Sequence, residues 1–200
     1  MPRTIGILLA GGSSRRFPPN KLLEPMRGEP LFWHALRALA ATCDEVVVMV
    51  GASQPDPALP KLSTPLFVRH DRSTAGPLAA LADALATATT DVALVAAGDT
   101  PGVPPELLRA MRDGLREGNA DALVLREGNA LRPLPVALRP ARCALIARGL
   151  VERGILRLGV LVEYGELNVD ARDETWWRKY DDAGAWRRDV DEPADLSPGA

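Results

Sequence analysis

The sequence predicts a single-domain, three-layer α/β/α protein built on a mainly parallel sheet. Several strand-length runs are apolar without alternating with polar residues, which is typical of strands buried on both faces. Helix-length segments separate these runs, and that alternation favours parallel strands joined by crossovers that cover both faces of the sheet. The 200 residues, 46% of them hydrophobic and 25% charged, suffice for one core, and neither a repeat nor a linker divides them.

The individual elements follow from these patterns. The strongest strand predictions are the apolar runs at 4–9, 45–50 and 91–96, and weaker ones are at 65–68 and 120–125. Helices are expected at 30–40, 78–88, 105–117 and 142–150. Residues 134–138 are predicted to form an edge strand, because Pro135 has no N–H to donate to a sheet. Three tryptophans near the end of the chain are expected to cover the sheet edge: Trp176, Trp177 and Trp186.

Charge and cysteine usage exclude several classes of partner. A net charge of -2 gives no general attraction to nucleic acid or to anionic membranes, so a polyanionic ligand needs a local cluster of cations. No apolar run approaches the ~18 residues of a membrane span. Cys43 and Cys143 lack the spacing of a zinc site or a disulfide framework, and we expect buried, reduced thiols in a cytoplasmic protein.

The loop after the first strand has the composition of a phosphate-binding loop. Leu9-Ala10-Gly11-Gly12 leads into two serines and two arginines, the second being Arg16, and Lys21 follows. Glycines allow close backbone approach to an anion, while arginine and lysine match phosphate oxygens. The spacing fits neither a Walker loop nor a dinucleotide fingerprint. A glycine turn flanked by solvated basic residues is the alternative for this loop taken alone.

Two carboxylates are candidate ligand-binding groups, Asp99 because it stands at an expected strand end and Asp71, which alone could equally be a surface charge, because it precedes a helix. Asp99 follows the run at 91–96 in a Gly-Asp-Thr-Pro turn, and Asp71 precedes the helix that opens at Gly76-Pro77. Ligands of open parallel sheets bind beyond these strand ends, and magnesium takes one or two carboxylates together with substrate phosphate oxygens. Asp99 is therefore the predicted metal ligand, with simple turn capping as the alternative.

Six segments spread over the chain resemble one family, the molybdenum cofactor guanylyltransferases, which are nucleotidyltransferases with a glycosyltransferase-A-like (nucleotide-diphospho-sugar transferase-like) fold. They are the loop at 9–21, Gly28-Glu29-Pro30-Leu31, Ala75 to Leu81, Gly98-Asp99-Thr100-Pro101, Arg132 to Leu138 and Asp189 to Leu196. The segments occur in the family's order. Together they are far more specific than any one alone.

The resemblance implies transfer of GMP from GTP to molybdopterin with release of pyrophosphate and with Mg²⁺ as cofactor. It assigns Arg16, Lys21 and Asp99 to catalysis, and Asp99 with Asp191 to the metal. Residues 1–102 become the nucleotide-binding half and 103–196 the acceptor-binding half. It also implies transient contact with proteins that deliver or accept the cofactor. The nucleotide-binding set is Leu9, Ala10, Gly11, Gly12, Lys21, Asp71, Gly76 and Asp99.

The chain also departs from the family's pattern, which leaves alternatives open. Pro18 stands where the loop usually has glycine, and Asn20 where it usually has aspartate. Asp189 and Asp191 replace the usual asparagines of the closing motif. A cytidylyltransferase of the same cofactor, a sugar-phosphate nucleotidyltransferase, and a nucleotide-binding regulatory domain without turnover all remain alternatives. Neither the base, the acceptor nor the oligomeric state is decided by the sequence.

Overall fold

The computed structural model describes residues 3–11, 21–72, 76–163 and 165–196 and contains a seven-stranded sheet. The strands lie in the order β5-β4-β1-β6-β8-β7-β9, and every neighbouring pair is parallel except the two that β8 forms. Their bounds are β1 (Thr4–Leu9), β4 (Glu45–Val50), β5 (Leu66–His70), β6 (Val92–Ala97), β7 (Ala122–Glu127), β8 (Ala130–Leu138) and β9 (Val169–Arg172).

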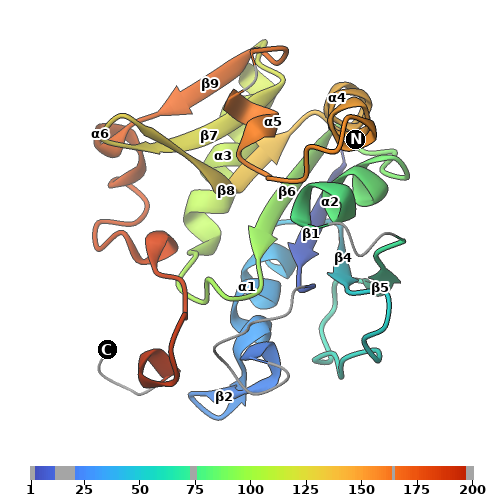
Figure 1. The fold of residues 1–200 in the computed structure, drawn as a ribbon. Coiled ribbons are helices and arrows are strands. Elements are labelled where there is room, and N and C mark those ends of the chain that lie inside the picture. Colours follow the sequence, from blue (N-terminus) through green and yellow to red (C-terminus); the bar gives the residue numbers. More distant parts are fainter. Residues whose placement is uncertain (1–2, 12–20, 73–75, 164, 197–200) are drawn as a thin grey trace.

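Helices cover both faces of this sheet (Figure 1). One face carries α2 (Pro77–Leu85), α4 (Pro140–Glu152) and the short α5 (Val160–Glu163), while the other carries α1 (Leu31–Ala40) and α3 (Pro105–Glu117). Smaller elements are the ribbon of β2 (Pro25–Met26) and β3 (Glu29–Pro30), the short α6 (Glu174–Trp177), and single 3-10 turns at Lys21–Leu23, Ala185–Arg187 and Pro193–Leu196. The predicted three-layer α/β/α architecture is confirmed.

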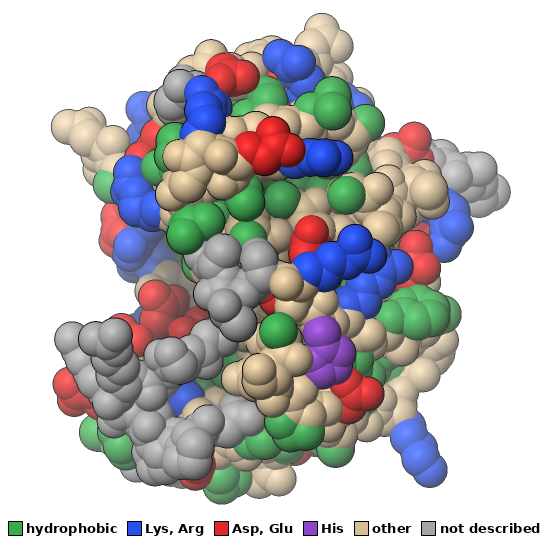
Figure 2. All heavy atoms as spheres, turned by 45° about the vertical axis from the view of Figure 1, so that its right-hand side comes forward, with side chains coloured by type: hydrophobic (Ala, Val, Ile, Leu, Met, Phe, Trp, Pro, Cys, Tyr) green, Lys and Arg blue, Asp and Glu red, His purple; other side chains and the backbone are tan. Residues whose placement is uncertain are grey.

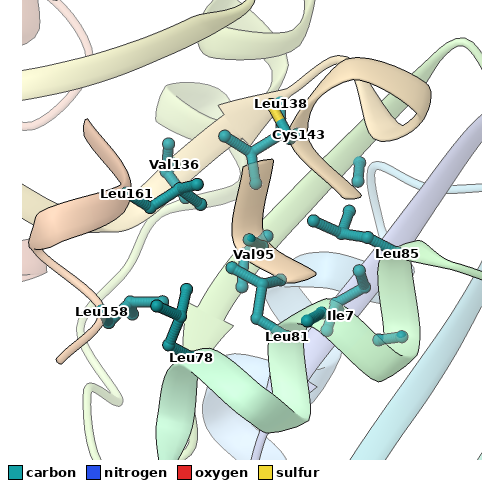
Figure 3. Close-up of a cluster of buried hydrophobic side chains, with 14 of the residues drawn as sticks. Ile7, Leu78, Leu81, Leu85, Val95, Val136, Leu138, Cys143, Leu158 and Leu161 are labelled. Atoms are coloured by element: carbon teal, nitrogen blue, oxygen red, sulfur yellow. The ribbon is translucent and has the colours of Figure 1, made fainter. Parts of the chain in front are cut away.

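Each helical layer encloses its own apolar core, because alternate side chains of a buried strand point to opposite faces. Ile7 packs toward α2 and α4, and Leu8, the next residue, packs toward α1 and α3. Figure 3 shows the first of these cores, where leucines of α2 meet Val95 of β6 and residues of α4 and α5. Trp177 and Trp186 are fully buried in the second core, edge to face with each other.

Two of the predicted elements need correction. The prediction of an edge strand at 134–138 was wrong, because β8 lies inside the sheet between β6 and β7. The ladder to β7 shifts register between its partners Val136 and Arg132, so that Pro133 and Pro135 fall in an irregularity where no ladder N–H is required. The helix predicted at 78–88 ends at Leu85 and begins at Pro77.

The parallel strands β1, β4 and β6 end at one edge of the sheet, where the chain approaches itself closely. A Cβ atom at Gly11 would lie 3.2 Å from the Gly51 backbone nitrogen, so glycine allows the turn after β1 to pass the turn after β4. Both cysteines are free thiols; Cys143 is buried, as expected, whereas Cys43 is only partly buried. In the described ranges, no helix has the length and apolar character to cross a membrane.

Candidate nucleotidyltransferase site

A pocket of about 290 Å³ opens at the carboxyl ends of β1 and β4. Four residues of the predicted nucleotide-binding set line it: Leu9, Gly11, Asp71 and Gly76. The remaining wall is Met49, Val50, the turn at 51–54, Pro77 and Ala80. The wall is mainly apolar with few polar groups, as is usual for a pocket that holds a flat organic ring.

Ala10 does not line this pocket. Its side chain is buried in the core on the α1 and α3 face, and its N–H donates to the Met49 carbonyl at 2.8 Å. The Leu9 carbonyl accepts from the Gly98 N–H at 2.9 Å. These backbone groups therefore bind the turn after β1 to both neighbouring strand ends. Gly12 and Arg16 lie outside the described residues.

Asp71 and Gly76 frame the side of the pocket next to β5. Asp71 follows His70, the last residue of β5, and is only 8% exposed; its N–H donates to the Val50 carbonyl at 2.8 Å. Gly76 has a φ of +119°, a region that disfavours residues with a Cβ atom, and it directly precedes Pro77, the first residue of α2. The start of α2 and the Asp71 carboxyl group are thus brought to the same cavity.

Near this pocket edge of the sheet, a cluster of charges, the Lys21 cluster, joins three residues that are far apart in sequence: Lys21, Asp99 and Asp191. The Lys21 ammonium group lies 3.0 Å from Asp99 Oδ2 and 3.6 Å from Asp191 Oδ1. The lysine side chain is only 11% exposed, whereas those of Asp99 and Asp191 are 32% and 68% exposed. A single buried cation thus pairs with two carboxylates, one from the turn after β6 and one from the closing segment, and leaves a net negative charge.

The closing segment is held against the Asp99 turn by direct hydrogen bonds. The Val190 N–H donates to the Asp99 carbonyl at 2.9 Å, and the Thr100 hydroxyl donates to Asp189 Oδ1 at 3.1 Å. Burial raises the pKa of the Asp189 carboxyl group above its ordinary value, and the nearby charge of Asp99 adds to that rise. Asp189 and Asp191, which replace the family's usual asparagines, therefore lie at the predicted metal turn.

A second, wider pocket of about 480 Å³ is lined in large part by the closing segment. Asp191 and Asp189 line it together with basic residues, of which Arg27 and Arg188 form no salt bridge with another described residue. Pro101 and Gly102 of the Asp99 turn complete its floor. His34 also lines it, with Nε2 3.0 Å from the Met26 carbonyl oxygen. The pocket therefore combines arginine side chains, which can bind an anionic ligand, with the carboxyl groups of Asp189 and Asp191.

Sequence reasoning missed the turn at 51–54, which forms one wall of the first pocket. Within it the Gly51 N–H donates to Gln54 Oε1 at 2.8 Å, and the Gln54 N–H donates back to the Gly51 carbonyl at 2.9 Å. The position of Gly51 immediately after a strand was the available signal, because the ends of parallel strands form ligand sites. Sequence reasoning also gave no role to His70, which contacts this turn.

The donor set around Asp99 suits a divalent cation that is shared with a substrate. Asp99 and Asp191 supply carboxylate oxygens, and both already contact one positive charge, the Lys21 ammonium group. Within the described part of the chain, no group of three or more histidine, cysteine or acidic side chains is arranged to hold a metal by itself. Such a set fits magnesium, which binds through one or two carboxylates and completes its coordination with phosphate oxygens and water.

Comparison with known proteins shows the family of the chain. The profile of the family described as "MobA-like NTP transferase domain" matches residues 6–163. The chain belongs to this family. A molybdenum cofactor guanylyltransferase from Burkholderia vietnamiensis is 30% identical over 196 residues, covering 93% of each chain. As a member of the MobA-like NTP transferase family, the protein is a nucleotidyltransferase.

Solved structures support the same fold. The molybdopterin-guanine dinucleotide biosynthesis protein A from Archaeoglobus fulgidus superposes with a TM-score of 0.75 at 21% identity, covering 96% of this chain and 94% of that one. A protein from Mycobacterium tuberculosis, solved in complex with manganese, superposes with a TM-score of 0.60 at 23% identity and covers 86% of this chain and 88% of its own. Fold and family therefore agree, and the nucleotide-diphospho-sugar transferase-like architecture is confirmed.

Proposed function

We propose that this nucleotidyltransferase moves GMP from GTP to molybdopterin, releases pyrophosphate and uses Mg²⁺. One observation carries the proposal: the Lys21 ammonium group pairs with both Asp99 and Asp191. Asp99 follows Gly98, whose N–H binds the carbonyl of Leu9 in the first pocket, whereas Asp191 lines the second pocket. The charged cluster therefore stands where a group bound in one pocket would meet a group bound in the other.

The first pocket is assigned to the nucleoside of GTP. Its apolar wall would stack against the base, and Asp71, 8% exposed at its edge, would accept hydrogen bonds from the nucleoside. The triphosphate would then extend toward Lys21 and the glycine-rich loop. Arg16 and Gly12 are assigned to it by resemblance. In this arrangement residues 1–102 would contain most of the nucleotide site.

The reaction needs no covalent intermediate with the protein. A phosphate oxygen of the acceptor attacks the α-phosphorus in line, the bond to the bridging oxygen of the β-phosphate breaks, and pyrophosphate leaves. Lys21 would neutralise the charge that accumulates on the leaving group, and its buried position means that it is already oriented. Asp99 and Asp191 would hold magnesium, which withdraws charge from the phosphate oxygens when it is bound.

The second pocket is assigned to the acceptor, and its lining draws on the closing segment as well as on residues of the nucleotide-binding half, among them Arg27 and His34. Arg27 and Arg188 would bind the acceptor phosphate, because guanidinium groups match phosphate oxygens in bidentate fashion. The relatives' name supplies the identity of the acceptor: the Burkholderia vietnamiensis protein is a molybdenum cofactor guanylyltransferase. The manganese of the Mycobacterium tuberculosis structure is consistent with a divalent cation in this fold.

One assay decides between the proposal and its alternatives. The purified protein is given each of the four nucleoside triphosphates with Mg²⁺ and molybdopterin, and pyrophosphate release is followed. The proposal expects release with GTP and molybdopterin together. Release with CTP, or only when a sugar phosphate replaces molybdopterin, would assign the protein to another transferase. Tight triphosphate binding without release with any acceptor would indicate a regulatory domain.

A further inference from the structure

His70 bridges two parts of the rim of the first pocket. It is the last residue of β5 and directly precedes Asp71, which lines the pocket. Its Nδ1 lies 3.3 Å from the Gly51 carbonyl oxygen, and its Nε2 lies 2.8 Å from Asp56 Oδ1. Gly51 belongs to the turn at 51–54, which also lines the pocket. The imidazole ring therefore connects β5 to the turn after β4.

Both partners of the ring are hydrogen-bond acceptors. A backbone carbonyl oxygen and an ionised carboxylate have no proton to donate, so each contact requires an N–H from the imidazole. A neutral imidazole has one N–H, whereas the imidazolium ion has two. The observed pair of contacts is thus complete only in the positively charged form. Deprotonation leaves one of the two contacts without its hydrogen.

The contact between His70 and the Gly51 carbonyl oxygen, one half of the bridge formed by Gly51, His70 and Asp56, involves a residue of the pocket wall. The Gly51 carbonyl also accepts from the Gln54 N–H, and its N–H donates to Gln54 Oε1, so a displacement of Gly51 is transmitted through the turn. Gly51 and Gln54 both line the pocket. We propose that His70 is a positioning residue for nucleotide binding: its imidazolium form fixes the turn at 51–54 against β5, and its deprotonation loosens that wall. This inference rests on the assignment of the first pocket to GTP.

The charges around His70 act in the same direction. Its hydrogen bonds to Asp56 and to the Gly51 carbonyl raise the pKa of His70 above its ordinary value. Figure 2 shows the face around β5, where a histidine lies at the surface beside an acidic side chain. The neighbouring strand β4 presents the apolar Val50 in register with His70. The wall is therefore expected to loosen as the pH rises through the raised pKa of His70.

The other charged residues that neighbour His70 in the chain make their described contacts with residues other than His70. On β5, the guanidinium group of Arg69 donates to the Thr87 hydroxyl beyond α2. After β5, the backbone N–H of Arg72 donates to Asp83 on α2 at 3.3 Å. Asp71 is buried at the pocket. Asp56 is thus the carboxylate that contacts the ring, and it is the group to change in a test of the pKa.

The test compares GTP affinity between variants as a function of pH. The dissociation constant of GTP is measured from pH 5.5 to 9 for the wild type, His70→Gln and Asp56→Asn. The terminal phosphate of GTP titrates in this range too, so the informative quantity is the ratio of a variant's dissociation constant to that of the wild type. For His70→Gln we expect a ratio of about 5 at pH 6, the value of one net hydrogen bond, that falls to about 1 at pH 9.

Asp56→Asn provides the matched variant, because it keeps an acceptor oxygen and removes the charge. Without the Asp56 charge the pKa of His70 should be lower, so the GTP affinity of this variant should change at a lower pH than that of the wild type. A His70→Gln ratio that stays constant from pH 5.5 to 9, or an Asp56→Asn midpoint equal to that of the wild type, would overturn the inference.

A second readout separates this inference from the proposed function. The chain has two histidines, so the loss of one imidazole signal in His70→Gln assigns the NMR titration of His70. The amide signals of Gly51 and Gln54 should titrate with the same midpoint in the wild type and not in the variant. If GTP binds at no pH, the proposed function fails, yet these amides still test the bridge. If they do not follow His70, the bridge is refuted even where GTP binds.

Discussion

Lys21→Met is the substitution that probes the charged cluster most sharply. Methionine keeps much of the buried stem of a side chain that is 11% exposed, and it removes the positive charge between Asp99 and Asp191. Loss of one preorganised electrostatic group costs about 2.7–4 kcal/mol in the transition state, so kcat should fall about 100- to 1000-fold. Metal affinity without nucleotide should change in the opposite direction. In the wild type, a Mn²⁺ ion that binds Asp99 and Asp191 must compete with the Lys21 ammonium group, and breaking such a partly exposed ion pair costs about 1 kcal/mol. The variant does not pay this cost, so it should bind Mn²⁺ about fivefold more tightly.

The assay measures free Mn²⁺ by electron paramagnetic resonance in nucleotide-free protein, together with kcat for pyrophosphate release. Lys179→Met is the matched control, because Lys179 is an exposed lysine outside both pockets and should change neither quantity. A lower kcat together with a higher Mn²⁺ affinity indicates an electrostatic role, because misfolding would lower both kcat and Mn²⁺ affinity. Unchanged or weaker Mn²⁺ binding in Lys21→Met, or turnover within tenfold of the wild type, would refute the reasoning.

Three further predictions concern the acceptor side, the core and the thiols. A Cβ at Gly102 would lie 2.5 Å from the Ala185 carbonyl oxygen, so Gly102→Ala should displace the closing segment and raise the KM for the acceptor while GTP affinity stays unchanged; an unchanged KM would contradict this. Leu81→Ala empties a fully buried position and should lower the free energy of unfolding in urea by about 2–5 kcal/mol, and a loss below about 1 kcal/mol would show that the core on α2 and α4 has been misjudged. Burial raises the pKa of Cys43 and of Cys143 to about 12, so iodoacetamide at pH 8 should modify both thiols only after denaturation. Rapid modification of the native protein would contradict the burial of these thiol groups.

The sequence predicted the central layers well because their physical signals are local. The runs at 4–9, 45–50 and 91–96 became β1, β4 and β6 within one residue, since unbroken apolar runs indicate strands buried on both faces. The helix at 105–117 was predicted with its observed bounds as α3. The predicted edge position of β8 was wrong. The rule that proline favours an edge strand is local, and the sequence does not reveal the register shift that removes Pro133 and Pro135 from the ladder.

The site divides in the same way. Asp99 and Gly11 were predicted from their places at strand ends and Asp71 from its place before the helix that opens at Gly76, and the structure brings them to the same edge of the sheet. Asp191 entered only through the family resemblance, because a contact with Lys21 across 170 positions leaves no signal in composition or periodicity. His70 received no role because its two acceptors, Gly51 and Asp56, are contacts of the folded chain.

The most direct test of the proposed reaction follows the phosphorus atoms of GTP. Protein, Mg²⁺ and molybdopterin are incubated with GTP labelled either at the α- or at the γ-phosphate, and the products are separated. In-line attack on the α-phosphorus predicts that the α label appears in the acceptor product and the γ label in pyrophosphate. Transfer of the γ label to the acceptor, or its release as inorganic phosphate alone, would contradict nucleotidyl transfer at the Lys21–Asp99 site.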